Sequence, residues 1–188
     1  MKKFFTVIVL AVAVATSAFA QPKAIGLRGG YTGAEASYQH YLGSPNFIEV
    51  NAGLDLFGHL GGKVSALYNF TFAQPNWTSR GDWAWYAGAG VTTGVVYSNC
   101  KVKGENVEVK RGYEKGFMIG VPVQVGLSYT FWFPLQLSLD LRPSVGVHMH
   151  KDSVSNGDVV VKDNKVHTNF YKQGIFGAIP TLSVHYAF

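Results

Sequence analysis

Apolar side chains alternate with small or polar ones along most of the stretch from residue 117 to residue 150. In "FMIGVPVQVGLSYTF" an apolar or aromatic residue occupies every second position from Phe117 to Phe131. After a break at "WFP" the alternation resumes in "LQLSLDLRPSVGVHMH", from Leu135 to Met149. A period of two residues is the pattern of a β-strand. The stretch therefore predicts two long antiparallel strands, each with one apolar face and one small or polar face.

The same alternation, less regular, divides the rest of the chain into strands. Several segments exceed the roughly 5–6 residues of a typical soluble strand and suit the roughly 9–11 residues of a membrane-crossing strand. We predict an all-β fold, an eight-stranded antiparallel up-and-down transmembrane β-barrel, because eight strands close the smallest common barrel. The predicted strands are 24–33, 34–42, 46–57, 62–73, 82–98, 113–131, 135–151 and 169–188.

The composition of the two faces indicates which one points outward. Opposite the apolar face lie Gly, Ser, Gln and isolated charges, which suit a narrow packed lumen better than a face in contact with water. The apolar face itself carries no charge from Phe117 to Met149, and a Lys or Arg facing lipid at mid-depth costs about 2–4 kcal/mol. We expect the apolar face to point outward. The competing arrangement is a β-sandwich with the apolar face in its core.

The lengths of the connections support the barrel interpretation. The second, fourth and sixth connections read "GSP", "QPNWTSRG" and "WFP", whereas the two longest, at 99–112 and 152–168, fall on the other side. Outer-membrane barrels have short inner turns and longer outer loops. Aromatic residues gather near the short connections and predict an interfacial girdle. They are Phe47, Phe72, Trp77, Trp83, Trp85, Phe131, Trp132, Phe133, Tyr186 and Phe188.

Residues 1–20 read as a secretory signal peptide. "MKKFFTVIVLAVAVATSAFA" has two lysines, an apolar run and an Ala-Phe-Ala site. The run is shorter than the roughly 20 residues of a membrane-spanning helix. We predict cleavage after Ala20, so that residues 21–188 form one outer-membrane β-barrel domain. The residue directly after the predicted cleavage site is Gln21 and not a cysteine, which disfavours a lipoprotein anchor.

Composition excludes several classes of protein. Only 14% of residues are charged, against about 25% in a typical soluble domain. The single cysteine, Cys100, excludes a disulfide framework, and no role is assigned to it. The formal net charge of +5 includes the two lysines of the predicted signal peptide and is scattered. Nucleic acid is therefore not an expected partner.

The chain ends in "TLSVHYAF", where Leu182, Val184, Tyr186 and Phe188 fall on alternate positions. This closing stretch resembles the C-terminal β-signal of small outer-membrane β-barrels of the OmpA/OmpX type from Gram-negative bacteria. "SYQHYL", "WYAGAG" and "LSLDLRP" are similar in style to uncharacterised outer-membrane β-barrel domain families. The resemblance implies a cell outer-membrane location, contact with outer-membrane lipids and recognition of the last strand by the barrel-assembly machinery.

Polar residues on the inward face predict a network inside the lumen. Folding the hairpin about "WFP" sets Gly126 near Asp140, and closing the barrel brings Arg28 toward Ser183. Charges in a narrow lumen must pair or meet water. We expect a structural plug, with a proton or ion path as the alternative. The predicted network is Arg28, Glu49, Asn51, Asn69, Gln124, Asp140 and Arg142.

Three prolines fall inside predicted strands, where each removes a donor from the hydrogen-bond ladder. They are Pro122, Pro143 and Pro180. The first two are expected to be cross-strand neighbours, which suggests a shared bulge.

Catalytic chemistry finds little support in the sequence. Ser183 and His185 share a face near Asp140, but they point into the lumen rather than at lipid, so no catalytic residue is assigned. His148 and His150 have metal-ligand spacing, and His167 could approach from the facing strand. Two or three imidazoles without a carboxylate cage are weak evidence for a metal site. We therefore expect no metal site and no cofactor, with His148 and His150 as the only candidates.

The functional prediction is an integral outer-membrane β-barrel protein with a side-chain-filled lumen. Its role is expected to be structural or one of surface interaction, adhesion or binding, through the outer loops 99–112 and 152–168. Both loops read as hairpins with turn signals, and a surface ligand or protein is their expected partner. The alternative is a lipid-modifying outer-membrane enzyme, a lipid A or phospholipid hydrolase, or a narrow channel.

Overall fold

The computed structural model describes residues 23–43, 45–56, 60–101, 111–156 and 159–188. The predicted signal peptide, residues 1–20, lies outside these ranges. The elements are β1 (Lys23–Gly30), β2 (Gly33–Tyr41), β3 (Phe47–Asp55), β4 (Gly61–Ala73), β5 (Asp82–Lys101), β6 (Arg111–Thr130), β7 (Leu135–Leu141), β8 (Ser144–Asn156), β9 (Val159–Phe170), the 3-10 helix η1 (Lys172–Ala178) and β10 (Thr181–Ala187).

No helix within the described ranges is long and apolar enough to cross a membrane.

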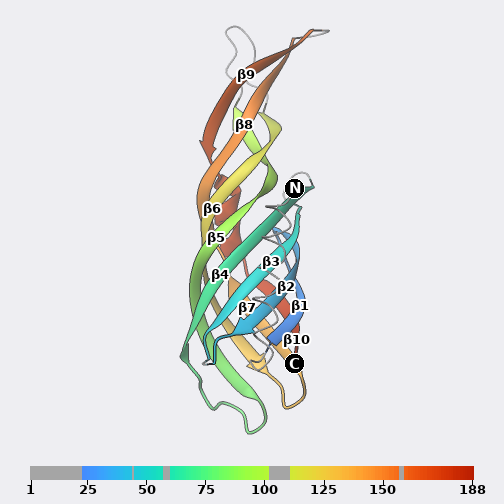
Figure 1. The fold of residues 1–188 in the computed structure, drawn as a ribbon. Helices are drawn as coiled ribbons and strands as arrows, with labels where there is room; N and C mark the ends of the chain where they lie inside the picture. The colour runs from blue at the N-terminus through green and yellow to red at the C-terminus, as the bar shows by residue number, and fades with distance from the viewer. Residues whose placement is uncertain (1–22, 44, 57–59, 102–110, 157–158) are drawn as a thin grey trace, which may run out of the picture.

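The strands form one antiparallel sheet that closes on itself (Figure 1). From β1 to β6 each strand pairs with its successor, β6 pairs with β7, and β10 closes the ring by pairing with both β7 and β1. The described strands thus form a ring of eight, to which β8 and β9 are added beside β6. The predicted fold class, a closed eight-stranded antiparallel barrel, is confirmed. The predicted pairings Gly126↔Asp140 and Arg28↔Ser183 are both present.

The seventh predicted strand, 135–151, is interrupted where Arg142 and Pro143 separate β7 from β8. Both pieces keep one register on β6, since Val125 faces Leu141 and Pro122 faces Ser144. Each strand has two residues between these pairs, so the expected shared bulge at Pro122 and Pro143 is not present. Pro180 immediately precedes β10. Two of the three prolines therefore lie just outside strands, where a missing donor costs little.

The eighth predicted strand, 169–188, is wrong as a continuous strand, because η1 separates β9 from β10. Between the pairs Val147↔Phe170 and Asp140↔Thr181, seven steps along β7 and β8 face eleven steps on the returning chain. The four surplus residues are accommodated as the 3-10 turn. This turn lies against the β7–β8 break, where the Arg142 amide donates to the Gly177 carbonyl at 2.6 Å.

Alternate residues along each strand lie in opposite environments. In β6, Val121 and Val123 are 48% and 50% exposed, whereas Met118 and Gln124 are 1% and 3% exposed. Among the described residues, 21 buried residues are polar or charged and seven are hydrophobic. The interior is therefore polar and the outer surface apolar, as the face composition predicted.

Aromatic rings cover one side of the barrel end that carries the short connections. Ring contacts run from Trp77 through Trp83 and Tyr129, and on through Phe131 to Phe133, with centroids 4.6–5.4 Å apart. One predicted member of the girdle is misplaced. Phe47 is 3% exposed and lies inside the barrel, its ring centroid 5.4 Å from that of Tyr86.

The barrel is much taller on one side than on the other (Figure 1). The last pair between β4 and β5 is Gly62↔Val95, but β5 and β6 remain paired as far as Lys101↔Arg111. Beside them, β8 and β9 continue to Asn156↔Val159. A four-stranded sheet in the order β5-β6-β8-β9 thus rises above the rim. It includes the described parts of the predicted loops 99–112 and 152–168. The side chains of 98–114 and 151–165 lie outside the description.

Candidate functional site: the charge network in the lumen

Arg28 of β1 is the central cation of the lumen. Its guanidinium group faces Asp140 of β7 with two hydrogen bonds, one of them from Nη1 to Oδ2 at 2.9 Å. Glu49 of β3 lies 3.5 Å from the same Nη1, and Glu35 of β2 lies 3.7 Å from Nε. Arg28 is 4% exposed and therefore has little contact with water. The three carboxylates supply the opposite charge and the hydrogen-bond acceptors that a buried guanidinium group needs.

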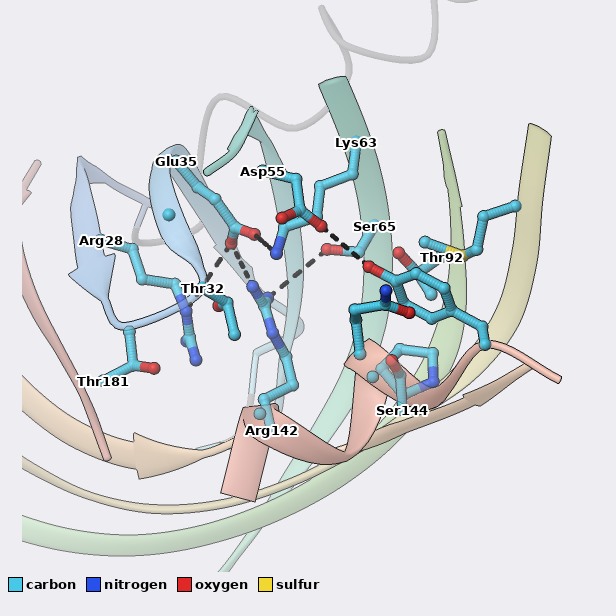
Figure 2. Close-up of a pocket in the computed structure, with 17 residues that line it drawn as sticks. Arg28, Thr32, Glu35, Asp55, Lys63, Ser65, Thr92, Arg142, Ser144 and Thr181 are labelled. Carbon is cyan, nitrogen blue, oxygen red and sulfur yellow. Dashed lines mark hydrogen bonds and ion pairs between the residues drawn. The ribbon is translucent and has the colours of Figure 1, made fainter. Parts of the chain in front are cut away.

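Glu35 is the anion on which three cations converge (Figure 2). Lys63 of β4 places Nζ 3.2 Å from Oε1, and Arg142 pairs with Oε2, the oxygen nearest Arg28. Arg142 comes from the β7–β8 break, and its Nη1 also donates to Ser65 Oγ at 3.4 Å. The break thus positions a cation that bonds residues of β2 and β4.

Glu49 is surrounded by hydrogen-bond donors. Side-chain amides of Asn51, Gln124 and Asn69 donate to its carboxylate at 2.9, 3.3 and 3.5 Å. Arg142 Nη1 lies 3.9 Å from Glu49 Oε1. All seven residues proposed from the sequence for the network therefore lie in the lumen and contact one another directly or through Glu49. Four charges, Arg28, Glu49, Asp140 and Arg142, form its centre.

The sequence interpretation missed Glu35 and Lys63, which complete the network. The sequence signal for Glu35 is the alternation of Glu35, Ser37 and Gln39 with less polar residues, which marks one polar face. The structure turns at residues 31–32, inside the predicted strand 24–33, and so sets Glu35 directly opposite Arg28. Lys63 lies two residues before Ser65 on the inward face of β4, so the alternation rule identifies it within the predicted strand 62–73. A further polar contact joins the hydroxyl of Tyr171 to Asp55 Oδ2 at 2.8 Å.

Two spaces flank the network along the barrel axis. The upper one, with a cavity volume of about 40 Å³ and partly open to solvent, is lined by charged and polar groups including Arg28, Glu35, Asp55 and Arg142. The lower one, with a cavity volume of about 710 Å³ and also partly open, is lined by residues such as Phe47. The two share no lining residue. Side chains of the network fill the lumen between them.

The lumen contains a serine–histidine contact that differs from the predicted one. His185 Nε2 lies 2.9 Å from Ser37 Oγ, while Ser183 Oγ has no partner among the described residues. Asp140 is bound by Arg28 and accepts from the Tyr86 hydroxyl at 3.3 Å. His185 Nδ1 also lacks a partner in the described chain, so no acid orients this imidazole. The set Ser183, His185 and Asp140 therefore does not form a hydrolytic triad.

The four residues proposed as an assembly signal all point outward from the closing strand. Leu182, Val184, Tyr186 and Phe188 are exposed, and the last two rings stack with centroids 6.4 Å apart. Phe188 is held by its backbone, because its amide donates to the Lys23 carbonyl at 2.7 Å and its carbonyl accepts from Lys23 at 2.9 Å. The final aromatic residue thus stays in the wall with its ring on the outer surface.

The histidines considered as metal ligands lie away from this network, at the base of the rising sheet. His148 and His150 are buried on its inward face, and His167 is paired with His150 across β8 and β9. As the side chains stand, the described residues include no group of three or more His, Cys, Asp or Glu able to hold an ion.

No protein-family model matches the chain, and no curated protein matches it. Among solved structures, the chain is similar to the N-terminal β-barrel domain of OprF from Pseudomonas aeruginosa, whose crystal structure is known. The TM-score is 0.49, and sequence identity is 12% over 89% of this chain and 97% of that domain.

Proposed function

We propose that the chain is an integral outer-membrane protein whose barrel is a membrane-anchored scaffold with a plugged lumen. One observation carries this proposal, the reversal of the usual burial pattern. Apolar side chains such as Leu27 and Val91 are 71% and 61% exposed on the outer face, whereas the ionised network is inside. Soluble monomers rarely expose contiguous apolar patches above a few hundred Å². In a bilayer the exposed apolar side chains would contact lipid hydrocarbon instead of water, so an apolar outer face is expected there.

The closed ring also satisfies what a bilayer requires of a backbone. Lipid offers no hydrogen-bond partners, so a strand can cross it only where both edges are paired. β10 supplies the final pairing by binding β1 and β7. The predicted signal peptide and the outward-facing alternation Leu182, Val184, Tyr186 and Phe188 support export and recognition by the barrel-assembly machinery.

The tall side of the barrel supports a surface-interaction role. The sheet β5-β6-β8-β9 extends the chain beyond the rim into the regions 99–112 and 152–168. Among the described strands, β9 pairs only with β8, and β5 has no β4 partner beyond Val95. Unpaired strand edges can accept a partner strand. We propose adhesion or binding of a surface ligand or protein at this sheet.

Membrane location is tested by fractionating cells and running the membrane fraction on gels with and without boiling. The proposal predicts recovery in the outer membrane and a heat-dependent change in migration, which reports an intact barrel. Protease added to intact cells should cleave within 99–112 or 152–168 and leave the barrel protected. Recovery as a water-soluble monomer without detergent would refute the proposal.

The surface role is tested with two variants. In the first, residues 102–110 are replaced by a two-residue turn, and in the second, residues 157–158 are deleted. Both should migrate as folded barrels. Strains carrying them should lose cell aggregation and adherence to an inert surface relative to wild type. Unchanged adherence with both hairpins shortened would leave the chain a purely structural barrel.

A narrow channel is the second candidate, favoured by the two spaces on either side of the network. Planar-bilayer recording tests it directly, since the plug account predicts no unitary conductance from the wild type. Mass analysis of lipid A from a deletion strain tests the remaining alternative, a lipid-modifying enzyme, and the proposal predicts an unchanged spectrum.

A further inference from the structure

Three histidines come together where the rising sheet leaves the barrel. His148 and His150 lie two residues apart on β8, and His150 faces His167 of β9 in register. Their ring centroids are 5.4 Å apart between His148 and His150 and 6.3 Å apart between His150 and His167. Residues two apart on a strand and residues directly opposite share one face of a sheet. From this cluster we infer a binding site for a divalent transition-metal ion, a function separate from the scaffold role.

His148 already has the surroundings of a metal ligand. Its Nε2 lies 3.2 Å from the Val96 carbonyl oxygen, which can only accept, so Nε2 is the protonated nitrogen. In the neutral ring Nδ1 then carries the lone pair, and it has no hydrogen-bond partner in the described chain although His148 is 0% exposed. Ligating histidines usually donate their other ring nitrogen to a carbonyl or carboxylate in this way. An ion at Nδ1 would satisfy an otherwise unpaired buried acceptor.

The ring separations fit one shared ion. A metal–nitrogen bond of about 2.0–2.1 Å puts a ring centre about 3 Å from the ion, so two coordinating rings have centroids about 5 Å apart at a tetrahedral angle and about 6.5 Å apart on opposite sides of the ion. The separation of 5.4 Å between His148 and His150 is close to the tetrahedral value, and that of 6.3 Å between His150 and His167 requires the exposed His167 to turn inward. The His148 and His150 rings are stacked with their planes 21° apart, so the His150 ring must also rotate before its nitrogen can meet an ion bound at His148 Nδ1.

The donor set defines the class of ion. Imidazole suits Zn²⁺, Cu²⁺ and Ni²⁺, whereas Mg²⁺ and Ca²⁺ prefer oxygen ligands. Three imidazoles leave at least one coordination position for water or an external ligand. If the rising sheet lies outside the cell, as the proposed function has it, the ion would come from the external medium.

The test uses the protein purified from membranes in detergent without a histidine tag. Zn²⁺ affinity is measured by calorimetry, and the nitrogen ligands of bound Cu²⁺ are counted by electron paramagnetic resonance. We expect one saturable site with imidazole nitrogens on Cu²⁺, and no response to Mg²⁺. A second-shell change alone costs 10–100-fold in affinity, so loss of a ligand in H150Q or H167Q should weaken Zn²⁺ binding by about tenfold or more.

H40Q is the matched control, because His40 lies at the other end of the barrel beside Lys23. It should bind Zn²⁺ as the wild type does. H167Q alters an exposed side chain, and its heat-dependent gel migration verifies that it is folded. The proposal is overturned if wild-type protein shows no saturable binding of Zn²⁺, Cu²⁺ or Ni²⁺, or if folded H167Q and H150Q bind with wild-type affinity. Either result leaves the membrane scaffold proposal intact.

Discussion

The outer face and the lumen of this barrel are made by alternate residues of the same strands, yet charge has opposite consequences on the two faces. On β7, Leu139 is 53% exposed and its neighbour Asp140 is 2% exposed. The outer face is a repetitive apolar surface on which one hydrophobic side chain can replace another. The lumen depends on specific partners, since each of its buried ions is matched by a named group. If the outer face meets lipid, a charge is therefore expected to stabilise the barrel at Asp140 and to destabilise it at Leu139.

Removing an anion from the lumen should have the largest effect. Asp140→Ala leaves Arg28 buried with only its more distant carboxylates, and breaking a buried ion pair from one side costs about 3–5 kcal/mol. We expect a loss of that size in the free energy of unfolding, measured by urea titration in lipid vesicles. Asp140→Asn keeps the shape and should lose less. A new conductance in Asp140→Ala at unchanged stability would contradict the plug and favour the channel.

Adding a cation to the outer face should have the next largest effect. Val123 is exposed in the middle of β6, and Val123→Arg should cost about 2–4 kcal/mol in vesicles if it faces the bilayer midplane. Val123→Leu is the control and should leave the free energy of unfolding nearly unchanged. If the arginine variant is as stable as the leucine variant in the same urea titration, the outer face does not meet lipid.

A substitution in η1 tests whether this 3-10 turn is packed against the β7–β8 break in the barrel wall. A Cβ placed on Gly177 would lie 1.9 Å from the Arg142 carbonyl oxygen. Gly177→Ala must therefore move η1 away from the β7–β8 break, at a cost of about 1–3 kcal/mol by analogy with overpacked cores. Gly29→Ala is the control, because a Cβ there meets nothing within 4 Å. Equal urea midpoints for the two variants would show that η1 is not held against the break.

The smallest expected effect comes from the upper lumen, which is partly open to water. Tyr171→Phe removes the hydrogen bond to Asp55 and should cost about 1 kcal/mol, the usual net value of one hydrogen bond. The measurement is again the urea midpoint in vesicles. A cost as large as that of Asp140→Ala would mean that the upper cavity is as dry as the network below it.

The strict period of two made the outer and inner faces readable from the sequence. Alternation alone assigns Val123 to the outer face and Gln124 to the lumen. The short turn "WFP" fixes the register of the two strands that it connects. Phe47 was misassigned because an aromatic residue near a short connection suits both a girdle and a lumen plug, and only its parity distinguishes them. Parity applied to 46–57 places Phe47 on the side of Glu49, which is the lumen.

The interruption of the eighth strand is harder to predict. The stretch "YKQGIFGAIP" lacks a clear alternation, but nothing in it indicates that the chain here has four residues more than the β7–β8 segment it faces. That number follows from the registers on β7 and β8, which are set by contacts distant in sequence. The ion pairs of Arg142 have the same origin, since the break positions its side chain toward Glu35. Long-range register, rather than local pattern, decides both features.

The orientation of the sheet is measured most directly by spin labels placed one at a time along β6. The labelled cysteines would replace residues 119 to 125 in protein whose native Cys100 is changed to serine, reconstituted in lipid vesicles. If the apolar face meets lipid, labels at Ile119, Val121, Val123 and Val125 should collide with oxygen dissolved in the acyl chains and be shielded from a water-soluble nickel chelate. Labels at the intervening positions should be far less accessible to oxygen. Reversed parity, or outward labels that respond to the water-soluble reagent, would contradict it.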